Sequence, residues 1–354
     1  MTWRGTRLSE DQRDLAAMLD ALANDRAIDL SNDDPATIAR VRKELAELGV
    51  WTLGVSEEHG GGGADPFTVG AAMERLGRHW PALGWASTQT HAALDALGDL
   101  EPDAYANLRD GLHSGTTTIA VVDSAAVHVQ LDSTGARLTG AIDRVDTSAD
   151  SPSVLVLDGA NRAILIPSAA TASVPIRGTG LDGALTRSLT VDAAAEDIVE
   201  VTGPGIAAAH IRLMLGATAV AAGIAGAASD DALEYTRSRH QFGGPLTAIP
   251  TVRLSLFDQS ARTAVLDSLA LCATDDLVTA TGLARRACAD AIDVATSALQ
   301  SHGGYGYLSE YPAERHLRDA ISLRAATDVD GAAERAAALL VGRPSNPTLI
   351  KEAS

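Results

Sequence analysis

The sequence changes its pattern twice, and these two changes limit the folds that the chain can adopt. Between residue 116 and about residue 202, short runs of β-branched residues are separated by Gly, Asn, Asp and Pro, which is typical of strands joined by turns. On both sides of this region, apolar residues recur at spacings of three and four, as they do in amphipathic helices. The sequence therefore predicts an α+β fold in which a β-domain of about six to eight strands separates two helical regions.

The points at which the pattern changes give the predicted domain boundaries. We expect an N-terminal α-helical domain at residues 1–115, a β-barrel or sandwich domain at 116–203, a C-terminal four-helix bundle at 204–343 and a polar tail at 344–354. The four helices of the bundle are expected at about 205–238, 247–275, 278–302 and 312–342. Asp33 or Asp34 is expected to cap a helix that starts at Pro35, and Asp158–Asn161 is expected to form a hairpin turn.

Charge and composition limit which partners the protein can bind and which cellular compartment suits it. The net charge is −18, from 28 basic and 46 acidic residues. Nucleic acid and anionic membranes bind clustered cations, so we expect neither of them as a partner. The first residues lack the apolar core of a signal peptide, and Cys272 and Cys288 have no metal-binding spacing. These features favour a reducing cytoplasm and no metal site. The longest apolar run, residues 213–228, is short for a membrane span and suits a packed helix instead.

Two short motifs in the second helical region carry residues that are suited to bind an anionic ligand. The first is Arg-His-Gln-Phe-Gly, with Arg239 and Phe242, and the second is Gln-Ser-His-Gly-Gly, with Gln300, Gly303 and Gly304. A guanidinium binds phosphate in a planar, bidentate geometry, and an amide can both donate and accept hydrogen bonds. Paired glycines allow another molecule to approach the backbone closely. Taken alone, each motif also fits an ordinary helix corner on the protein surface.

The two motifs together, in this order and at this separation, resemble those of the acyl-CoA dehydrogenase family. The glycine-rich segment at 48–63 and the segment at 178–192 also resemble parts of that family, so that the resemblance covers essentially the whole chain. It implies FAD as the cofactor and the α,β-dehydrogenation of an acyl-CoA thioester as the reaction. By the same resemblance, Arg239 pairs with the FAD diphosphate, Phe242 packs on the flavin or the adenine, and Gln300, Gly303 and Gly304 hold the far end of the cofactor across a dimer interface.

The resemblance is incomplete where the family holds the flavin ring. The family has a Thr-Glu-Pro-x-x-Gly-Ser-Asp loop at the start of the β-domain, but this chain has residues 120–129, with only Asp123 and Ser124 of similar polarity. Arg144 stands where the family has Trp in a Trp-Ile-Thr-Asn motif. Both changes remove groups that clasp the ring. We expect the nearby Asp143 and Asp146 to be solvated strand ends rather than catalytic acids.

The resemblance is also incomplete at the catalytic base. The family's usual base is a Glu seven residues after Arg-Asp-Ala, and Thr327 stands at that position here. A second base position, used by some members, falls near Leu213, and no carboxylate lies between Glu200 and Asp230. If three extra residues are allowed, Asp330 is a substitute with a shorter side chain than Glu. We therefore assign no firm catalytic residue and treat Asp330 as a weak candidate.

The chain keeps one part of a flavin site and has lost the other. In this it resembles one subunit of a heteromeric (α2β2) bacterial acyl-CoA dehydrogenase. In such complexes one subunit has lost the base and the ring loop. We expect this chain to be that subunit, with a homologous partner that supplies the base, an acyl-CoA substrate and electron-transfer flavoprotein as a candidate electron acceptor. Two alternatives stay open, namely a homomeric enzyme with Asp330 as its base and a non-catalytic scaffold without flavin. Paired subunits of this type resemble those that act on steroid side chains.

Overall fold

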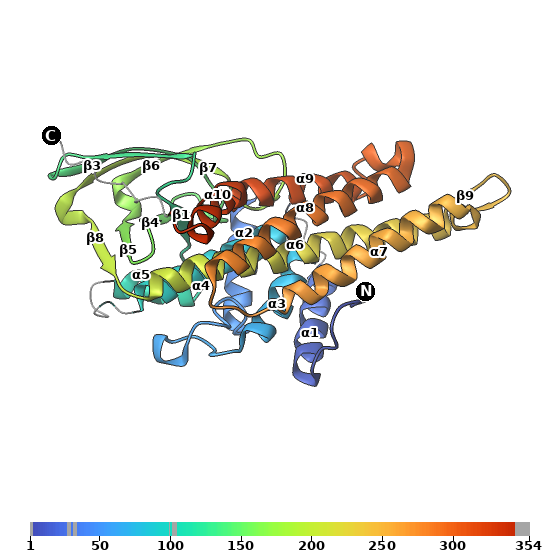
Figure 1. Ribbon diagram of the computed structural model, residues 1–354, viewed down its shortest axis with the longest axis horizontal. Helices are drawn as coiled ribbons and strands as arrows, with labels where there is room; N and C mark the ends of the chain where they lie inside the picture. The colour runs from blue at the N-terminus through green and yellow to red at the C-terminus, as the bar shows by residue number, and fades with distance from the viewer. Residues whose placement is uncertain (1–2, 27–29, 31–33, 99, 101–104, 344–354) are drawn as a thin grey trace.

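The computed structural model describes residues 3–26, 30, 34–98, 100 and 105–343. The tail predicted at 344–354 and the candidate cap Asp33 lie outside these residues. The predicted α+β fold is confirmed, because helices precede and follow a β-sheet domain along the chain (Figure 1). The first helical part consists of α1 (Glu10–Arg26), α2 (Pro35–Glu47), α3 (Pro66–His79), α4 (Pro81–Leu97) and α5 (Ala106–His113).

Local capping explains where two of the first helices begin. Asp34 precedes α2, and its carboxylate accepts hydrogen bonds from the backbone N–H groups of Ala36 and Thr37. Asp65 precedes α3 and accepts from Phe67 and Thr68 in the same way. Both helices carry proline in the first turn, where no N–H group is needed. A cap of this kind stabilises a helix by about 1 kcal/mol. An Asp directly before Pro in the sequence therefore predicts where each of these two helices starts.

The β-domain consists of two four-stranded sheets that enclose an apolar core of their own. One sheet has the order β1-β4-β5-β8 and the other the order β2-β3-β7-β6. The eight strands are β1 (Ile119–Asp123), β2 (Val129–Ser133), β3 (Arg137–Val145), β4 (Ser153–Leu157), β5 (Arg162–Ile166), β6 (Thr171–Pro175), β7 (Arg187–Ala194) and β8 (Val199–Thr202). Residues such as Val154 and Ile164 of the first sheet pack with Ile142 and Leu189 of the second. The predicted turn at Asp158–Asn161 joins the antiparallel strands β4 and β5.

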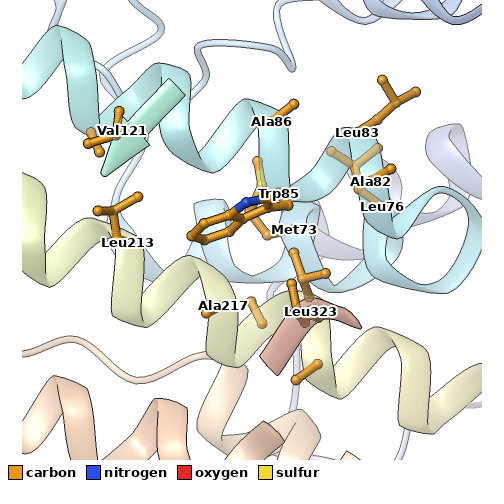
Figure 2. Packing of buried hydrophobic residues seen from close by; sticks show 14 of the residues in the cluster. Met73, Leu76, Ala82, Leu83, Trp85, Ala86, Val121, Leu213, Ala217 and Leu323 are labelled. Atoms are coloured by element: carbon orange, nitrogen blue, oxygen red, sulfur yellow. The ribbon is translucent and has the colours of Figure 1, made fainter. Parts of the chain in front are cut away.

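The long helix α6 (Gly205–Ser238) is the centre of the molecule, and it packs against α3, α4, α7 (Pro250–Ala270), α8 (Leu277–His302) and α9 (Ala313–Ala326). It is long and apolar enough to cross a membrane, but 78% of its most apolar window is buried inside the protein. Glycines allow its close contact with α3, since a Cβ at Gly223 would lie 2.1 Å from the carbonyl oxygen of Glu74. Figure 2 shows Trp85 of α4 in this core, beside Leu213 and Ala217 of α6.

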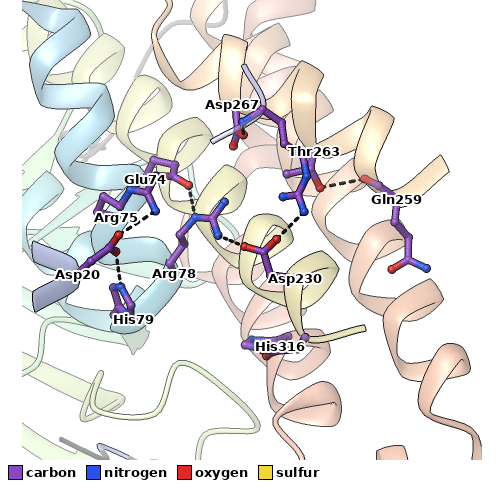
Figure 3. A network of polar contacts seen from close by, with 12 residues as sticks. Asp20, Glu74, Arg75, Arg78, His79, Asp230, Gln259, Thr263, Asp267 and His316 are labelled. Carbon is purple, nitrogen blue, oxygen red and sulfur yellow. Dashed lines mark hydrogen bonds and ion pairs between the residues drawn. The ribbon is translucent and has the colours of Figure 1, made fainter. Parts of the chain in front are cut away.

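A network of buried charges also holds α6 in place (Figure 3). Arg78 of α3 is fully buried, and it donates to Glu74 at 2.5 Å and to Asp230 of α6 at 2.8 Å. Near the N-terminus, the backbone N–H of Arg4 donates to Asp267 of α7 at 2.9 Å. Burial raises the pKa of Asp267 to about 7, and repulsion by Glu74 acts in the same direction. Removing one partner from such a cluster leaves an unpaired buried charge, which typically costs about 3–5 kcal/mol.

The last predicted helix is split in two, which corrects the expected span of 312–342. The structure has α9 and then α10 (Val329–Leu340), because Asp328 between them adopts a left-handed backbone conformation with φ 44° and ψ 38°. An L-residue in this conformation cannot continue a right-handed helix. As a result α10 lies next to β1, where Arg335 of α10 is 3.3 Å from Asp123 (Figure 1). Helical periodicity alone did not reveal this break.

Candidate functional site

The structure brings the two sequence motifs together at the end of the helical domain that lies far from the β-sheets (Figure 1). Arg239 follows α6 and precedes a small hairpin of β9 (His240–Gln241) and β10 (Gly244–Pro245). Its guanidinium lies over the ring of Tyr305, 4.7 Å from the ring centroid. Tyr305 belongs to the short 3-10 helix Gly303–Tyr307 that follows Gln300. We call this region, formed by residues 239–245 and 300–308, the tip.

An aromatic cluster that the sequence did not reveal fixes the geometry of the tip. Tyr235 stacks on His302 with a centroid separation of 4.4 Å, and it contacts Tyr311 edge-on at 5.5 Å. Tyr305 also packs edge-on against Tyr311 at 5.8 Å. Aromatic residues make up only 3% of the chain. Their concentration near the two motifs was a signal available in the sequence, but only the fold shows that the rings are in contact.

Four of the five predicted cofactor-binding residues of the tip are exposed, and Arg239 is half-buried. Phe242 is 91% exposed and has φ 55°, an uncommon conformation for a bulky residue. Gln300, Gly303 and Gly304 are exposed as well, and a Cβ at Gly303 or Gly304 would meet no other atom within 4 Å. No close contact inside the chain therefore requires the glycine at position 304. An aromatic ring and bare backbone are therefore accessible to another molecule here.

The donors of the tip fit the diphosphate end of FAD. Among the described residues, no carboxylate forms an ion pair with Arg239, so that its guanidinium keeps donors for a phosphate. Phe242 offers an apolar ring, and Gln300 offers an amide next to the two glycines. These groups suit an elongated anionic cofactor that lies against the tip from outside the chain.

A cavity of about 190 Å³ lies at the opposite end of α6, between β1, α4, α6, α8 and α10. We call it the β1–α6–α10 cavity. It is lined by Leu213 and Thr327, the two positions at which the family resemblance placed a base. Asp123, from the segment that replaces the family's ring loop, also lines it. The structure thus gathers into one cavity three of the four places where the sequence showed losses, and Arg144, the fourth, is not among the lining residues.

Asp330 lies outside this cavity and does not have the properties of a base. It accepts two hydrogen bonds from Arg324, both at 2.9 Å, and its side chain is 57% exposed. The hydrogen bond to Arg324 lowers the pKa of Asp330, whereas a general base needs a raised pKa. Asp328, two residues earlier, does line the cavity. Helical periodicity predicted a continuous helix there and gave no sign that this carboxylate reaches a cavity.

Asp146 was expected to be a solvated strand end, and this expectation is wrong. Its side chain is buried and accepts hydrogen bonds from Arg144 at 2.6 Å and from the Thr186 hydroxyl at 2.6 Å. The amide of Gln89 in α4 donates to its backbone carbonyl at 2.7 Å. Asp146 therefore joins the β-domain to the first helical part. Asp143 is exposed, as expected.

A second cavity, of about 480 Å³, lies between α3, α4, α6 and the connection after α7. Its walls are mainly apolar, with polar groups at the end where Arg212 pairs with Asp95 at 2.9 Å. Burial lowers the pKa of His91 in this wall to about 3, so the ring is neutral. Its Nε2 accepts from the backbone N–H of Gly54, in the glycine-rich segment 48–63. That segment therefore contacts His91, one of the residues that line the cavity.

Comparison with known proteins first defines the class of protein. The fold matches a glutaryl-CoA dehydrogenase from Mycobacterium smegmatis in complex with FADH2 with a TM-score of 0.79 and 17% identity, over 96% of both chains. It also matches the Tcur3481-Tcur3483 steroid ACAD with a TM-score of 0.76 and 20% identity, over 94% of this chain and 98% of that one. The protein therefore has the acyl-CoA dehydrogenase fold.

The sequence then places the chain within that class. Residues 9–99 match the N-terminal domain of acyl-CoA dehydrogenases, and residues 203–340 match their C-terminal domain. An acyl-CoA dehydrogenase of Bacillus subtilis is 27% identical over 319 residues, which cover 78% of this chain and 83% of that protein. The chain belongs to the acyl-CoA dehydrogenase family, whose members depend on FAD.

Proposed function

We propose that this chain is one subunit of a heteromeric FAD-dependent acyl-CoA dehydrogenase and that its tip completes the FAD site of a homologous subunit. Arg239 binds the diphosphate, Phe242 packs on the cofactor, and Gln300, Gly303 and Gly304 hold its adenosine end. The ring of the flavin lies on the partner, which also supplies the base that takes the α-proton of the acyl-CoA substrate. The family to which the chain belongs supports the reaction, and the subunit arrangement is our proposal.

The exposure of the tip is the observation that carries this proposal. Arg239 has a cation–π contact with Tyr305 and no carboxylate partner among the described residues, while Phe242 is 91% exposed. A cofactor held only by these groups would be covered on one side, because the tip projects away from the rest of the chain (Figure 1). A second subunit would have to provide the opposite wall. Such an arrangement suits an interface in which each subunit gives part of the site.

The state of the candidate base positions supports a base from the partner. Thr327 and Leu213 occupy the two family positions, and neither side chain accepts a proton at neutral pH. Asp330 is hydrogen-bonded to Arg324 and is not among the residues that line the cavity with Thr327. The likeness to the Tcur3481-Tcur3483 steroid ACAD makes steroid side-chain thioesters the first substrates to test.

When bound, FAD is the oxidant that accepts a hydride from the β-carbon of the substrate. The residues of this chain would act on its position and charge rather than on the reacting bonds. The Arg239 guanidinium neutralises part of the diphosphate charge, and the stacked ring of Tyr305 keeps that guanidinium in place. Phe242 excludes water from one face of the cofactor. These roles require that the tip and the partner close on the cofactor together.

The decisive experiment compares the chain alone with its native assembly. We expect the chain expressed by itself to be colourless. When it is purified with a tag from its own organism, we expect a yellow complex that contains a homologous subunit with a carboxylate at the position of Thr327. A stable yellow homotetramer with full FAD occupancy from this chain alone would contradict the heteromeric arrangement. A colourless native complex would favour a scaffold without flavin.

A further inference from the structure

The second cavity, of about 480 Å³, is separate from the β1–α6–α10 cavity, and we call it the α3–α6 cavity. Leu215 of α6 lines it, whereas Leu213 lines the other cavity. Because an α-helix has about 3.6 residues per turn, side chains two residues apart point to nearly opposite sides of the helix. The two cavities share no lining residue. The proposed function therefore leaves the α3–α6 cavity without a role.

Close helix packing holds the walls of the α3–α6 cavity. A Cβ at Gly70 of α3 would lie 1.9 Å from the carbonyl oxygen of Ala270, and a Cβ at Gly216 of α6 would lie 2.2 Å from the side chain of Thr88 in α4. Met73, which also lines the cavity, is 1% exposed. The surrounding helices are thus in contact with one another around a space that is already formed. Preformed, mostly apolar cavities of roughly 300–1,000 Å³ are the usual form of small-molecule sites.

Most polar side chains of this cavity already have partners within the chain. The neutral ring of His91 accepts at Nε2 from the backbone N–H of Gly54 at 2.9 Å, so its proton is on Nδ1, which donates to the carbonyl oxygen of Ser87 at 2.8 Å. The hydroxyl of Thr88 donates to the carbonyl oxygen of Gly84 at 2.9 Å. A molecule in the cavity would therefore meet few groups that require a hydrogen bond from it.

Arg212 differs, because one of its nitrogens has no hydrogen-bond partner in the part of the chain that the structure describes. Its Nε donates to Asp95 at 2.9 Å and its Nη2 to the carbonyl oxygen of Gly54 at 3.2 Å, which leaves Nη1. Asp95 balances the charge of the guanidinium, and the exposed Asp275 adds a negative charge to the lining. An anionic head group would lack a compensating cation here, whereas a neutral oxygen acceptor would suit Nη1.

We propose that the α3–α6 cavity is a second binding site, which takes an elongated, neutral apolar molecule with one ketone or hydroxyl oxygen. The apolar part of the molecule lies along the walls formed by α3 and α6, and its oxygen accepts a hydrogen bond from Arg212. The site is distinct from the one for the acyl-CoA substrate. It needs neither flavin nor a partner subunit, so its test does not depend on the proposed function.

Calorimetry of the full-length chain with 2-decanone tests the site directly. We expect one molecule to bind per chain. Decanoate has a similar apolar chain and a negative head group, and at pH 8 we expect its affinity to be lower by about tenfold or more. Butyryl-CoA should not displace 2-decanone. Absence of 2-decanone binding, equal or tighter binding of decanoate, or displacement by butyryl-CoA would each overturn the inference.

Two variants on the same helix locate the bound molecule. Leu215→Trp places an indole ring in the α3–α6 cavity, and we expect the affinity for 2-decanone to fall by about tenfold or more because the ring occupies part of the space. Leu213→Trp is the matched control, since it makes the same change in the β1–α6–α10 cavity. We expect it to leave the affinity for 2-decanone unchanged. Loss of binding in Leu213→Trp with retention in Leu215→Trp would contradict the assignment.

Cys272 provides a measurement that needs no variant and holds even if Leu215→Trp does not fold. Its thiol lines the α3–α6 cavity and is half-buried, whereas Cys288 is only 1% exposed and lies outside the cavity. With 2-decanone at about ten times its dissociation constant, modification of Cys272 by a soluble disulfide reagent should slow by about tenfold. Decanoate at the same concentration should protect the thiol less. An unchanged rate of Cys272 modification in saturating 2-decanone would overturn the inference.

Discussion

The tip and the β1–α6–α10 cavity differ in whether their polar and charged side chains have ion-pair partners within the chain. At the tip, Phe242 is 91% exposed and Arg239 rests on the ring of Tyr305. In the cavity, Arg335 pairs with both Asp123 and Asp328. The groups of the tip are therefore open to solvent, whereas the charged groups of the cavity wall pair with one another.

The largest expected effect contrasts two aromatic residues, one from each region. Trp85 lines the cavity and is 2% exposed, so Trp85→Ala should destabilise the fold by about 3–5 kcal/mol. Phe242→Ala should change stability by no more than about 0.5 kcal/mol, since its ring contacts solvent. Urea denaturation of both variants measures the difference. Equal losses of stability would show that the tip is packed within the chain after all.

The next effect concerns the charge at the tip. Arg239→Ala removes a guanidinium that we expect to bind diphosphate, and a charge-assisted hydrogen bond of this kind contributes roughly 1.5–3 kcal/mol. The affinity of the native complex for FAD should therefore fall by about tenfold or more, and its FAD content should be lower. The measurement is the ratio of flavin absorbance to protein, with Arg237→Ala, on the last turn of α6, as a control. Unchanged FAD retention in Arg239→Ala would make Arg239 an ordinary surface residue.

A smaller effect is expected from a single added methyl group. The methyl group added by Gly304→Ala would meet no atom of the chain within 4 Å. The free energy of unfolding of this variant should therefore stay within about 0.5 kcal/mol of that of the unchanged protein. The same methyl would touch a cofactor that approaches the backbone closely, and FAD retention should fall less than in Arg239→Ala. Thermal denaturation and flavin absorbance of one preparation give both values. A large loss of stability would show that the glycine serves the fold.

The smallest effect on the flavin is expected at Asp330. Its pKa is lowered in the folded protein by the hydrogen bond from Arg324, so its stabilising contribution is present above the unfolded value of 3.8 and is lost as pH falls through the folded value. Because the pair is exposed, Asp330→Asn should cost about 0.2–1 kcal/mol at pH 7 and nothing at low pH. Denaturation at both pH values tests this. Flavin reduction by substrate should remain unchanged, and a loss of about 10² would identify Asp330 as a base instead.

Features that depend on neighbouring residues could be predicted from the sequence. The α–β–α order, the cap at Asp34 and the hairpin turn at Asp158–Asn161 follow from periodicity and turn chemistry, which act over a few residues. The two motifs of the tip were also recognisable, because each of them is contiguous in the chain. Their functional assignment remains a prediction.

Features that depend on distant segments were decided only by the tertiary structure. Arg239 and Tyr305 are far apart in sequence, and their stacking requires that α6 and α8 pack side by side. The cavity unites β1, α6 and α10, and no local pattern shows that these segments meet. Asp328 escaped notice because a single left-handed residue interrupts a helical pattern without changing its composition. The sequence determined the helices, strands and motifs, while the packing of α6 against its neighbours decided which carboxylate faces a cavity and which faces water.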